Sequence, residues 1–191
     1  EKIDSFDDYV IPFRCNAVDL LTGDEIIFKN GSLAKALRSS SSIPSVFSPV
    51  NDNDLLLVDG GILNNLGTDI AKNLGADIII AVNSSTYRKK KSEFVDVFDV
   101  LYQSIQLNAL KKKKKNLQLS TILIEPKLDF TNILDFNLKK LETIYSAGYK
   151  ATYDNIQPLI NIKNNLPKDT ESSYLILSSI PSDSINISSI S

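Results

Sequence analysis

One carboxylate in this sequence follows a buried strand at a position suited to acid–base chemistry. The apolar run Leu55–Val58 leads into Asp59-Gly60-Gly61, which predicts a strand followed by a tight bend. A carboxylate at such a bend can take a proton from a hydroxyl nucleophile if partial burial raises its pKa. Asp59 is therefore the candidate base. The alternative is a structural turn aspartate that only accepts hydrogen bonds from backbone N–H groups.

Missing residue types restrict the chemistry further. The 191 residues include no histidine, so the chain alone cannot assemble a Ser-His-Asp triad, a Cys-His pair or a histidine-ligated zinc site. The single cysteine, Cys15, has no partner that would lower the pKa of its thiol, which favours a packing role over a nucleophilic one. The run Ser39–Ser42 lacks a glycine elbow, and we interpret it as a turn.

The elements before Asp59 are predicted from local signals. Residues 12–28 indicate a β-hairpin with Thr22-Gly23-Asp24 in its turn, and Asp19 is interpreted as a cap of that turn. Ser32 is the expected N-cap of a short helix over residues 33–38. These elements lead directly into the serine run.

The elements after Asp59 indicate an α/β protein. A helix is expected over residues 68–73, and a second buried strand over residues 77–82. A strand, a helix and a strand at this spacing are typical of a parallel unit, so this strand is expected to run parallel to Leu55–Val58. Ligands of such folds gather at the carboxyl ends of the strands, where Asp59 lies.

Further helical and strand patterns follow. Apolar residues from Phe94 to Ile105 recur at helical spacing, and this pattern ends in the five lysines Lys111–Lys115. Residues 117–124 predict an outer strand. A long helical pattern then places these residues on one face: Leu138, Leu141, Tyr145, Tyr149, Thr152 and Ile156. The spacing of Tyr145, Tyr149 and Tyr153 at i, i+4 and i+8 is interpreted as helix packing.

Two blocks of the sequence, in register with each other, resemble a known family. Ala36–Val50 contains Arg-Ser followed by Ile-Pro and Phe, and Leu57–Leu66 contains Asp-Gly-Gly. Together they resemble the second catalytic block of the patatin-like phospholipases, and weaker likeness extends the resemblance to roughly residues 10–160. The family implies a three-layer αβα fold with a mostly parallel central sheet, incomplete here at the amino-terminal side.

The resemblance also implies a function. In this family a serine in a Gly-x-Ser-x-Gly elbow pairs with the aspartate of Asp-Gly-Gly, without histidine or any cofactor. Asp59 would then be the catalytic carboxylate, with Gly60 and Gly61 shaping the site. No two glycines here lie four apart, so the serine is expected upstream of Glu1. The implied activity is phospholipase A-type ester hydrolysis; the alternative is a non-catalytic relic that binds lipid or protein.

Charge gives one candidate partner surface. With 21 Lys and Arg against 23 Asp and Glu, the net charge of −2 excludes a general attraction to nucleic acid. Lys111, Lys112, Lys113, Lys114 and Lys115 are either a solvated helix end or a peripheral contact with an anionic membrane surface.

The sequence predicts one long domain portion followed by a short tail. Residues 1–167 are expected to be the carboxyl-terminal portion of a patatin-like catalytic domain, which requires the amino-terminal part of the same domain. Residues 168–191 are expected to be a polar, Ser-rich tail with at most one short strand. No signal peptide or membrane-spanning run is visible, which favours a cytoplasmic or peripheral membrane location.

Overall fold

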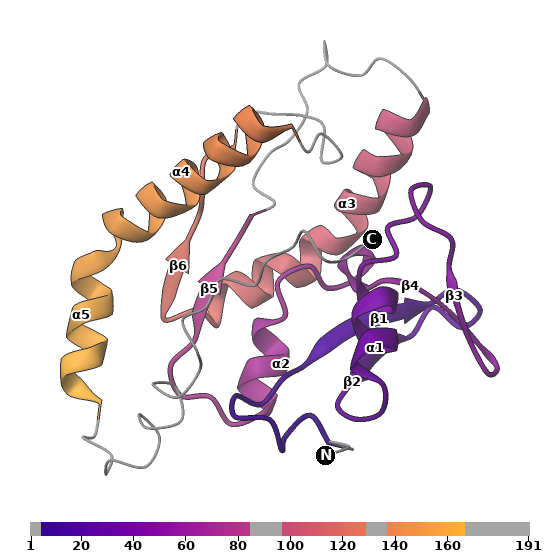
Figure 1. Cartoon of the computed structure of the whole chain (residues 1–191), viewed down its shortest axis with the longest axis horizontal. Helices are drawn as coiled ribbons and strands as arrows, with labels where there is room; N and C mark the ends of the chain where they lie inside the picture. Colours follow the sequence, from indigo (N-terminus) through magenta and orange to yellow (C-terminus); the bar gives the residue numbers. More distant parts are fainter. Residues whose placement is uncertain (1–4, 85–96, 129–136, 167–191) are drawn as a thin grey trace.

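The computed structural model describes residues 5–84, 97–128 and 137–166 (Figure 1). The strands are β1 (Cys15–Asp19), β2 (Glu25–Phe28), β3 (Val50–Asp52), β4 (Leu55–Asp59), β5 (Ile80–Val82) and β6 (Ile122–Ile124). The helices are α1 (Leu33–Ser40), the 3₁₀ helix η1 (Gly60–Ile62), α2 (Thr68–Asn73), α3 (Val97–Gln118), α4 (Leu138–Asp154) and α5 (Ile156–Asn165). The predicted tail over 168–191 and the predicted helix start at Phe94 lie outside the described residues.

Four strands form an antiparallel sheet in the order β2-β1-β4-β3. The predicted hairpin is confirmed, because Cys15 pairs with Phe28 and Val18 pairs with Glu25 across β1 and β2. Gly23 in the hairpin turn has a φ of +79°, a conformation that glycine adopts without steric cost. β4 then pairs with β1 on one side and with β3 on the other.

The mixed α/β class is confirmed, and the direction of the strands is not the expected one. The four-stranded sheet is antiparallel, and parallel pairing occurs between β5 and β6. The prediction that β4, α2 and β5 form a parallel unit is wrong, because β1 and β3 occupy both edges of β4 and β5 pairs with β6 instead. The helix α2 therefore connects two separate sheets.

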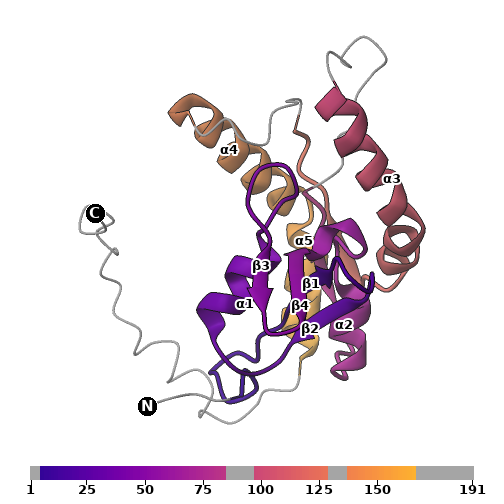
Figure 2. The same ribbon diagram turned by 90° about the vertical axis from the view of Figure 1, so that its right-hand side faces the viewer.

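Helices lie on both faces of the four-stranded sheet, as expected for three layers. Figure 2 shows α1 on one side of the sheet, with α2 and α3 on the other. Ala17 of β1 and Ala36 of α1 are both fully buried where these two elements pack. Alternation along β1 then directs Asn16 and Val18 to the opposite face.

The helix boundaries follow the sequence signals closely at α1 and α2. The side chain of Ser32 accepts a hydrogen bond from the backbone N–H of Lys35 at 3.3 Å, which confirms the predicted N-cap. α1 continues to Ser40, two residues beyond the predicted end. α2 covers the predicted residues, and Gly75 follows it with a φ of +91°.

The boundaries of α3 and β6 differ more from those predicted from the sequence. α3 contains the lysine run and continues through residues 117 and 118, where the sequence predicts strand, so that β6 keeps only three residues. In Figure 1, α4 and α5 lie one after the other on the left of the β5–β6 pair, whereas the four-stranded sheet lies on its right. None of the helices in the described ranges is sufficiently long and apolar to cross a bilayer.

The tyrosines of α4 do not pack as predicted. Tyr145, Tyr149 and Tyr153 are 73%, 64% and 63% exposed. Successive rings stack on one another at centroid distances of 6.4 and 6.3 Å. The predicted helical spacing is confirmed, but it produces an aromatic ladder on the helix surface instead of a buried face.

Candidate active site

Asp59 ends β4 and begins the turn into η1. Its carboxylate oxygen Oδ1 accepts a hydrogen bond from the backbone N–H of Gly61 at 2.7 Å. Its own backbone N–H donates to the carbonyl oxygen of Ser42 at 3.0 Å, which ties the end of β4 to the loop after α1. The side chain is partly buried, and this burial raises its pKa, although the Gly61 hydrogen bond opposes the shift. A raised pKa is the property that a carboxylate base requires.

The two glycines after Asp59 allow neighbouring side chains to lie close to the backbone of the turn. A Cβ atom on Gly60 would lie 2.4 Å from Cγ of Asn16, and one on Gly61 would lie 3.0 Å from Oδ1 of Asp59. Neither glycine is among the residues with positive φ. Their lack of a side chain is therefore needed for space around the turn and not for a left-handed backbone conformation.

Arg38 and Phe47, from the preceding block, help to hold the loop after α1 to which Asp59 is bonded. The Arg38 guanidinium donates to the hydroxyl of Ser42 and, at 3.2 Å, to the carbonyl of Ser48. It also lies over the ring of Phe47, 5.4 Å from the ring centroid. The hydroxyl of Ser42 donates back to the Arg38 carbonyl at 2.7 Å. These contacts fix the segment whose carbonyl receives the Asp59 N–H.

The serine run forms part of this support. Ser39 and Ser40 complete α1, and the Ser41 hydroxyl donates to the Leu37 carbonyl at 2.8 Å. Ser39 is fully buried, and its hydroxyl has no hydrogen-bond partner in the described part of the chain. None of the hydrogen bonds described for these serines ends on the Asp59 carboxylate. The run is structural, but the predicted turn is only partly confirmed, because Ser39 and Ser40 are helical and only Ser41 and Ser42 follow α1.

Asp19 is a buried cap, which extends the sequence interpretation. Its carboxylate accepts from the backbone N–H groups of Leu21 and Thr22 at 3.3 and 3.2 Å, and from the Thr22 hydroxyl at 2.9 Å. It also accepts from the N–H of Leu56 at 2.9 Å, a contact between β1 and β4 that the sequence did not predict. The Leu56 bond leads the causes that lower the pKa of Asp19. This carboxylate stabilises the hairpin and is a poor proton acceptor.

Cys15 does not have the properties of a nucleophile. It is a free, partly buried cysteine, and burial raises the pKa of its thiol despite a hydrogen bond with Ser40. Since the thiolate is the reactive form, a raised pKa makes the sulfur less reactive.

A polar network that was not predicted from the sequence lies on the face of the four-stranded sheet opposite α1. Its members come from β1, β2, the loop after η1, α2 and α3; they are Asn16, Glu25, Asn64, Asp69, Lys112 and Asn116. The Nδ2 atom of Asn64 donates to Glu25 at 2.8 Å and to Asp69 at 3.0 Å. We call these six residues the polar network.

Lys112 joins both carboxylates of the polar network. Its Nζ atom contacts Oε2 of Glu25 and lies 3.2 Å from Oδ2 of Asp69. Burial alone would raise the pKa of Asp69 and lower that of Lys112, but their hydrogen bonds and opposite charges reverse both shifts. The pKa of Asp69 is lowered and that of Lys112 is raised, so both groups stay charged at neutral pH.

The five lysines thus have different environments. Lys112 shares a helix face with Ala109 and Asn116, which are each 2% exposed. Lys111, Lys114 and Lys115 lie on other parts of α3, outside the polar network. The spacing of Ala109, Lys112 and Asn116 at i, i+3 and i+7 was a sequence signal for this inner face, but five identical residues concealed it.

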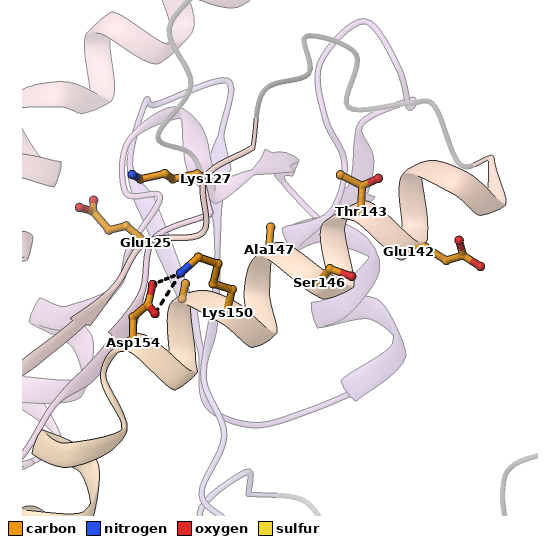
Figure 3. A pocket seen from close by; sticks show the side chains of 9 residues that line it. Glu125, Lys127, Glu142, Thr143, Ser146, Ala147, Lys150 and Asp154 are labelled. Atoms are coloured by element: carbon orange, nitrogen blue, oxygen red, sulfur yellow. Dashed lines mark hydrogen bonds and ion pairs between the residues drawn. The ribbon is translucent and has the colours of Figure 1, made fainter.

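A separate hollow lies along α4 (Figure 3). Its volume is about 620 Å³, and Glu125 and Lys127 line it together with α4 residues such as Ser146. Lys150 and Asp154 form an ion pair at its edge, with contacts of 3.0 and 2.8 Å. Asp59 and its neighbours do not line this hollow, so we do not assign it to the candidate active site.

Comparison with known proteins identifies the block that carries Asp59. Residues 5–72 match the family model described as Patatin-like phospholipase. An uncharacterized NTE family protein of Mycobacterium tuberculosis is 48% identical over 54 residues, which are 28% of this chain and 9% of that protein. Lysophospholipase NTE1 of Phaeosphaeria nodorum is 32% identical over 77 residues, 40% of this chain and 5% of that protein.

The resemblance to the patatin-like phospholipase family is therefore confirmed over the block that contains Asp59, Gly60 and Gly61. A second uncharacterized NTE family protein of M. tuberculosis is 41% identical over 73 residues, which are 38% of this chain and 20% of that protein. The chain spans between 5% and 20% of the length of these relatives.

Proposed function

We propose that this chain supplies the catalytic aspartate of a lipid acyl hydrolase, with Asp59 as the base of a Ser-Asp dyad. The serine would belong to a Gly-x-Ser-x-Gly segment outside residues 1–191. Residues 1–167 would then be the carboxyl-terminal portion of the catalytic domain. The observation that carries the proposal is a partly buried carboxylate with a raised pKa at the end of β4, inside the block that matches the family.

The proposed reaction is ester hydrolysis in two steps. The serine hydroxyl attacks the ester carbonyl as its proton passes to Asp59, and the resulting tetrahedral oxyanion is held by backbone N–H groups outside this chain. The proton then goes to the departing alcohol, which leaves an acyl-serine. Asp59 next takes a proton from water, the hydroxide attacks the acyl carbonyl, and the fatty acid departs as the serine recovers its proton.

The substrate class follows from the family and from one relative. The matched family is described as a phospholipase family, and the fungal relative is named a lysophospholipase. An ester-linked fatty acyl chain is common to both kinds of substrate. We therefore assign phospholipid or lysophospholipid esters to this chain as substrates of the proposed reaction.

A membrane contact through α3 belongs to this proposal. A lipid hydrolase must reach a lipid surface, and lysines close to anionic headgroups favour such contact by about 1 kcal/mol each. From the sequence, all five lysines of Lys111–Lys115 were candidates for this role. Because Lys112 is held in the polar network and Lys113 is half-buried, we restrict the proposed contact to the exposed Lys111, Lys114 and Lys115.

Release of fatty acid from 1-acyl-lysophosphatidylcholine tests the proposed function. A longer polypeptide carrying the serine segment followed by residues 1–191 should release fatty acid and lose this activity when the elbow serine becomes alanine. Residues 1–191 alone should release none. Hydrolysis by residues 1–191 alone would contradict the proposed dyad. Vesicle binding by the longer polypeptide without any hydrolysis would favour the non-catalytic alternative.

A further inference from the structure

The polar network connects α3 to the turn that follows Asp59. Asn64 lies at the centre of the connection and is 3% exposed. Its backbone N–H donates to the carbonyl of Gly60 at 2.9 Å, which closes the turn. Its side-chain amide donates to Glu25 and Asp69, the two carboxylates that Lys112 joins. A change at Lys112 therefore reaches the Gly60 turn through these carboxylates and Asn64.

Asn16 forms a second connection between the network and the turn. Its Nδ2 atom donates to Glu25 at 2.8 Å and to the Asn64 carbonyl at 3.1 Å. The same side chain lies against Gly60 so closely that a Cβ atom there would be 2.4 Å from its Cγ. The position of Asn16 thus sets how near Gly60 lies to β1. Gly61, the next residue, donates the hydrogen bond to the Asp59 carboxylate.

We propose that Lys112 is a positioning residue for Asp59, acting through Glu25, Asp69 and Asn64 on the turn at Gly60 and Gly61. This inference rests on the proposed function, because it concerns the geometry of the proposed base. Lys112 does not contact the reacting atoms. It fixes the turn that aims the carboxylate at the serine.

The charge of Lys112 is what the network requires. Glu25 and Asp69 both accept from the one amide nitrogen of Asn64, so their negative charges lie close together. The side chain of Glu25 is 15% exposed and that of Asp69 is 27% exposed, which limits screening of their repulsion by water. Without the ammonium group between them, the two carboxylates would separate, and Asn64 could no longer bond to both.

The test compares two lysine-to-glutamine variants in the longer, active polypeptide. Lys112→Gln removes the ammonium group from the network. Lys72→Gln is the matched control, because Lys72 is an exposed lysine of α2 whose Nζ donates to the Ala76 carbonyl at 3.2 Å. Turnover of a soluble nitrophenyl ester is measured per serine titrated with a reactive phosphonate, so that inactive protein is not counted.

Lys112→Gln should lower kcat per titrated serine by at least about tenfold with little change in KM, since a displacement of about 1 Å at a site can cost 10² in rate. Lys112→Arg, which keeps the charge, should recover most of the loss, and Lys72→Gln should match the unchanged protein. A purely structural role would reduce the number of titratable serines and leave kcat per serine unchanged. That result, or equal kcat for Lys112→Gln and Lys72→Gln, would overturn the proposal.

Two further variants complete the test. If Lys112→Gln does not fold, Glu25→Gln replaces it: the ion pair is weakened while the lysine remains, kcat per serine should fall, and an unchanged kcat overturns the proposal. Asp59→Asn distinguishes a failure of the proposed function from a failure of the role proposed for Lys112. Retained turnover in Asp59→Asn refutes the proposed function itself. Lost turnover in Asp59→Asn with normal kcat in Lys112→Gln refutes only the role of Lys112.

Discussion

Asp59 and Gly61 are joined by a hydrogen bond of 2.7 Å from the Gly61 backbone N–H to Oδ1 of the Asp59 carboxylate. This bond closes the turn after β4 and holds the carboxylate at the carboxyl end of that strand. It favours the charged form of Asp59, while burial favours the neutral form and has the larger effect on the pKa.

Gly60→Ala should destabilise the protein by about 1–3 kcal/mol, the usual cost of forcing an extra methyl group into a packed site. The added Cβ would meet Asn16 at 2.4 Å, and Asn16 is held by two hydrogen bonds of the polar network. The free energy of unfolding in urea measures this loss.

Gly148→Ala is the matched control for that variant. Gly148 lies within α4, and apart from the adjacent residues and the backbone of the helix itself, no heavy atom of the described residues lies within 4 Å of the Cβ that alanine would add. Alanine in a helix interior is favoured over glycine by about 0.5–1 kcal/mol, so this variant should be more stable than the unchanged protein. Equal stability of the two variants would contradict the close approach at Gly60.

Asp19→Asn should lower the stability of the protein at neutral pH. The native carboxylate accepts four hydrogen bonds, and its pKa is lowered in the folded state. Its stabilising effect is therefore complete above the unfolded pKa, about 3.9, and is lost as the pH falls through the folded value. The difference in melting temperature between the variant and the unchanged protein should shrink below that pH. A constant difference from pH 7 to pH 3 would show that the charge of Asp19 is unimportant.

Replacing Lys111, Lys114 and Lys115 together by glutamine should weaken binding to vesicles that contain phosphatidylserine. The loss should decrease as salt is added, because salt screens exposed charges. The control replaces Lys35, Lys72 and Lys163, three exposed lysines on other helices, and removes the same total charge. Sedimentation with vesicles measures both. If the two triple variants bind equally, α3 has no special contact with the membrane.

The sequence predicted the local elements around Asp59 well. The Ser32 cap, the hairpin turn at Gly23 and the strand ending at Asp59 each depend on residues close together in the chain. Strand partners depend on contacts between distant segments, and the expected parallel unit of β4, α2 and β5 was wrong for that reason. Local spacing cannot show that both edges of β4 are already occupied.

The polar network beside the candidate site could not be predicted from local sequence signals. Asn16, Asn64 and Asn116 have no distinctive spacing, yet hydrogen bonds join Asn64 to both of the others from distant parts of the chain. The spacing of Ala109, Lys112 and Asn116 marks the inner face of α3, but the four identical neighbours of Lys112 conceal which lysine joins the polar network. The tyrosine ladder of α4 was predicted to pack although it is exposed.

Asp59→Asn keeps the size of the side chain and an oxygen that can accept from Gly61. Because burial raises the pKa of the native carboxylate, the charged form of Asp59 destabilises the fold as the pH rises above the unfolded value. The asparagine side chain carries no such charge, so the melting temperature of the variant at neutral pH should equal or exceed that of the unchanged protein. This makes the variant suitable for testing activity separately from folding.

The most direct measurement is ester hydrolysis by Asp59→Asn in the longer polypeptide that carries the proposed serine. Asp24→Asn, at an exposed aspartate in the hairpin turn, serves as the control. Loss of a general base costs about 10² to 10⁴ in rate, and with no histidine among the 191 residues to replace it, we expect the upper part of that range. Asp24→Asn should keep normal turnover. Near-normal turnover by folded Asp59→Asn would show that Asp59 is a structural turn residue and would contradict the Ser-Asp dyad.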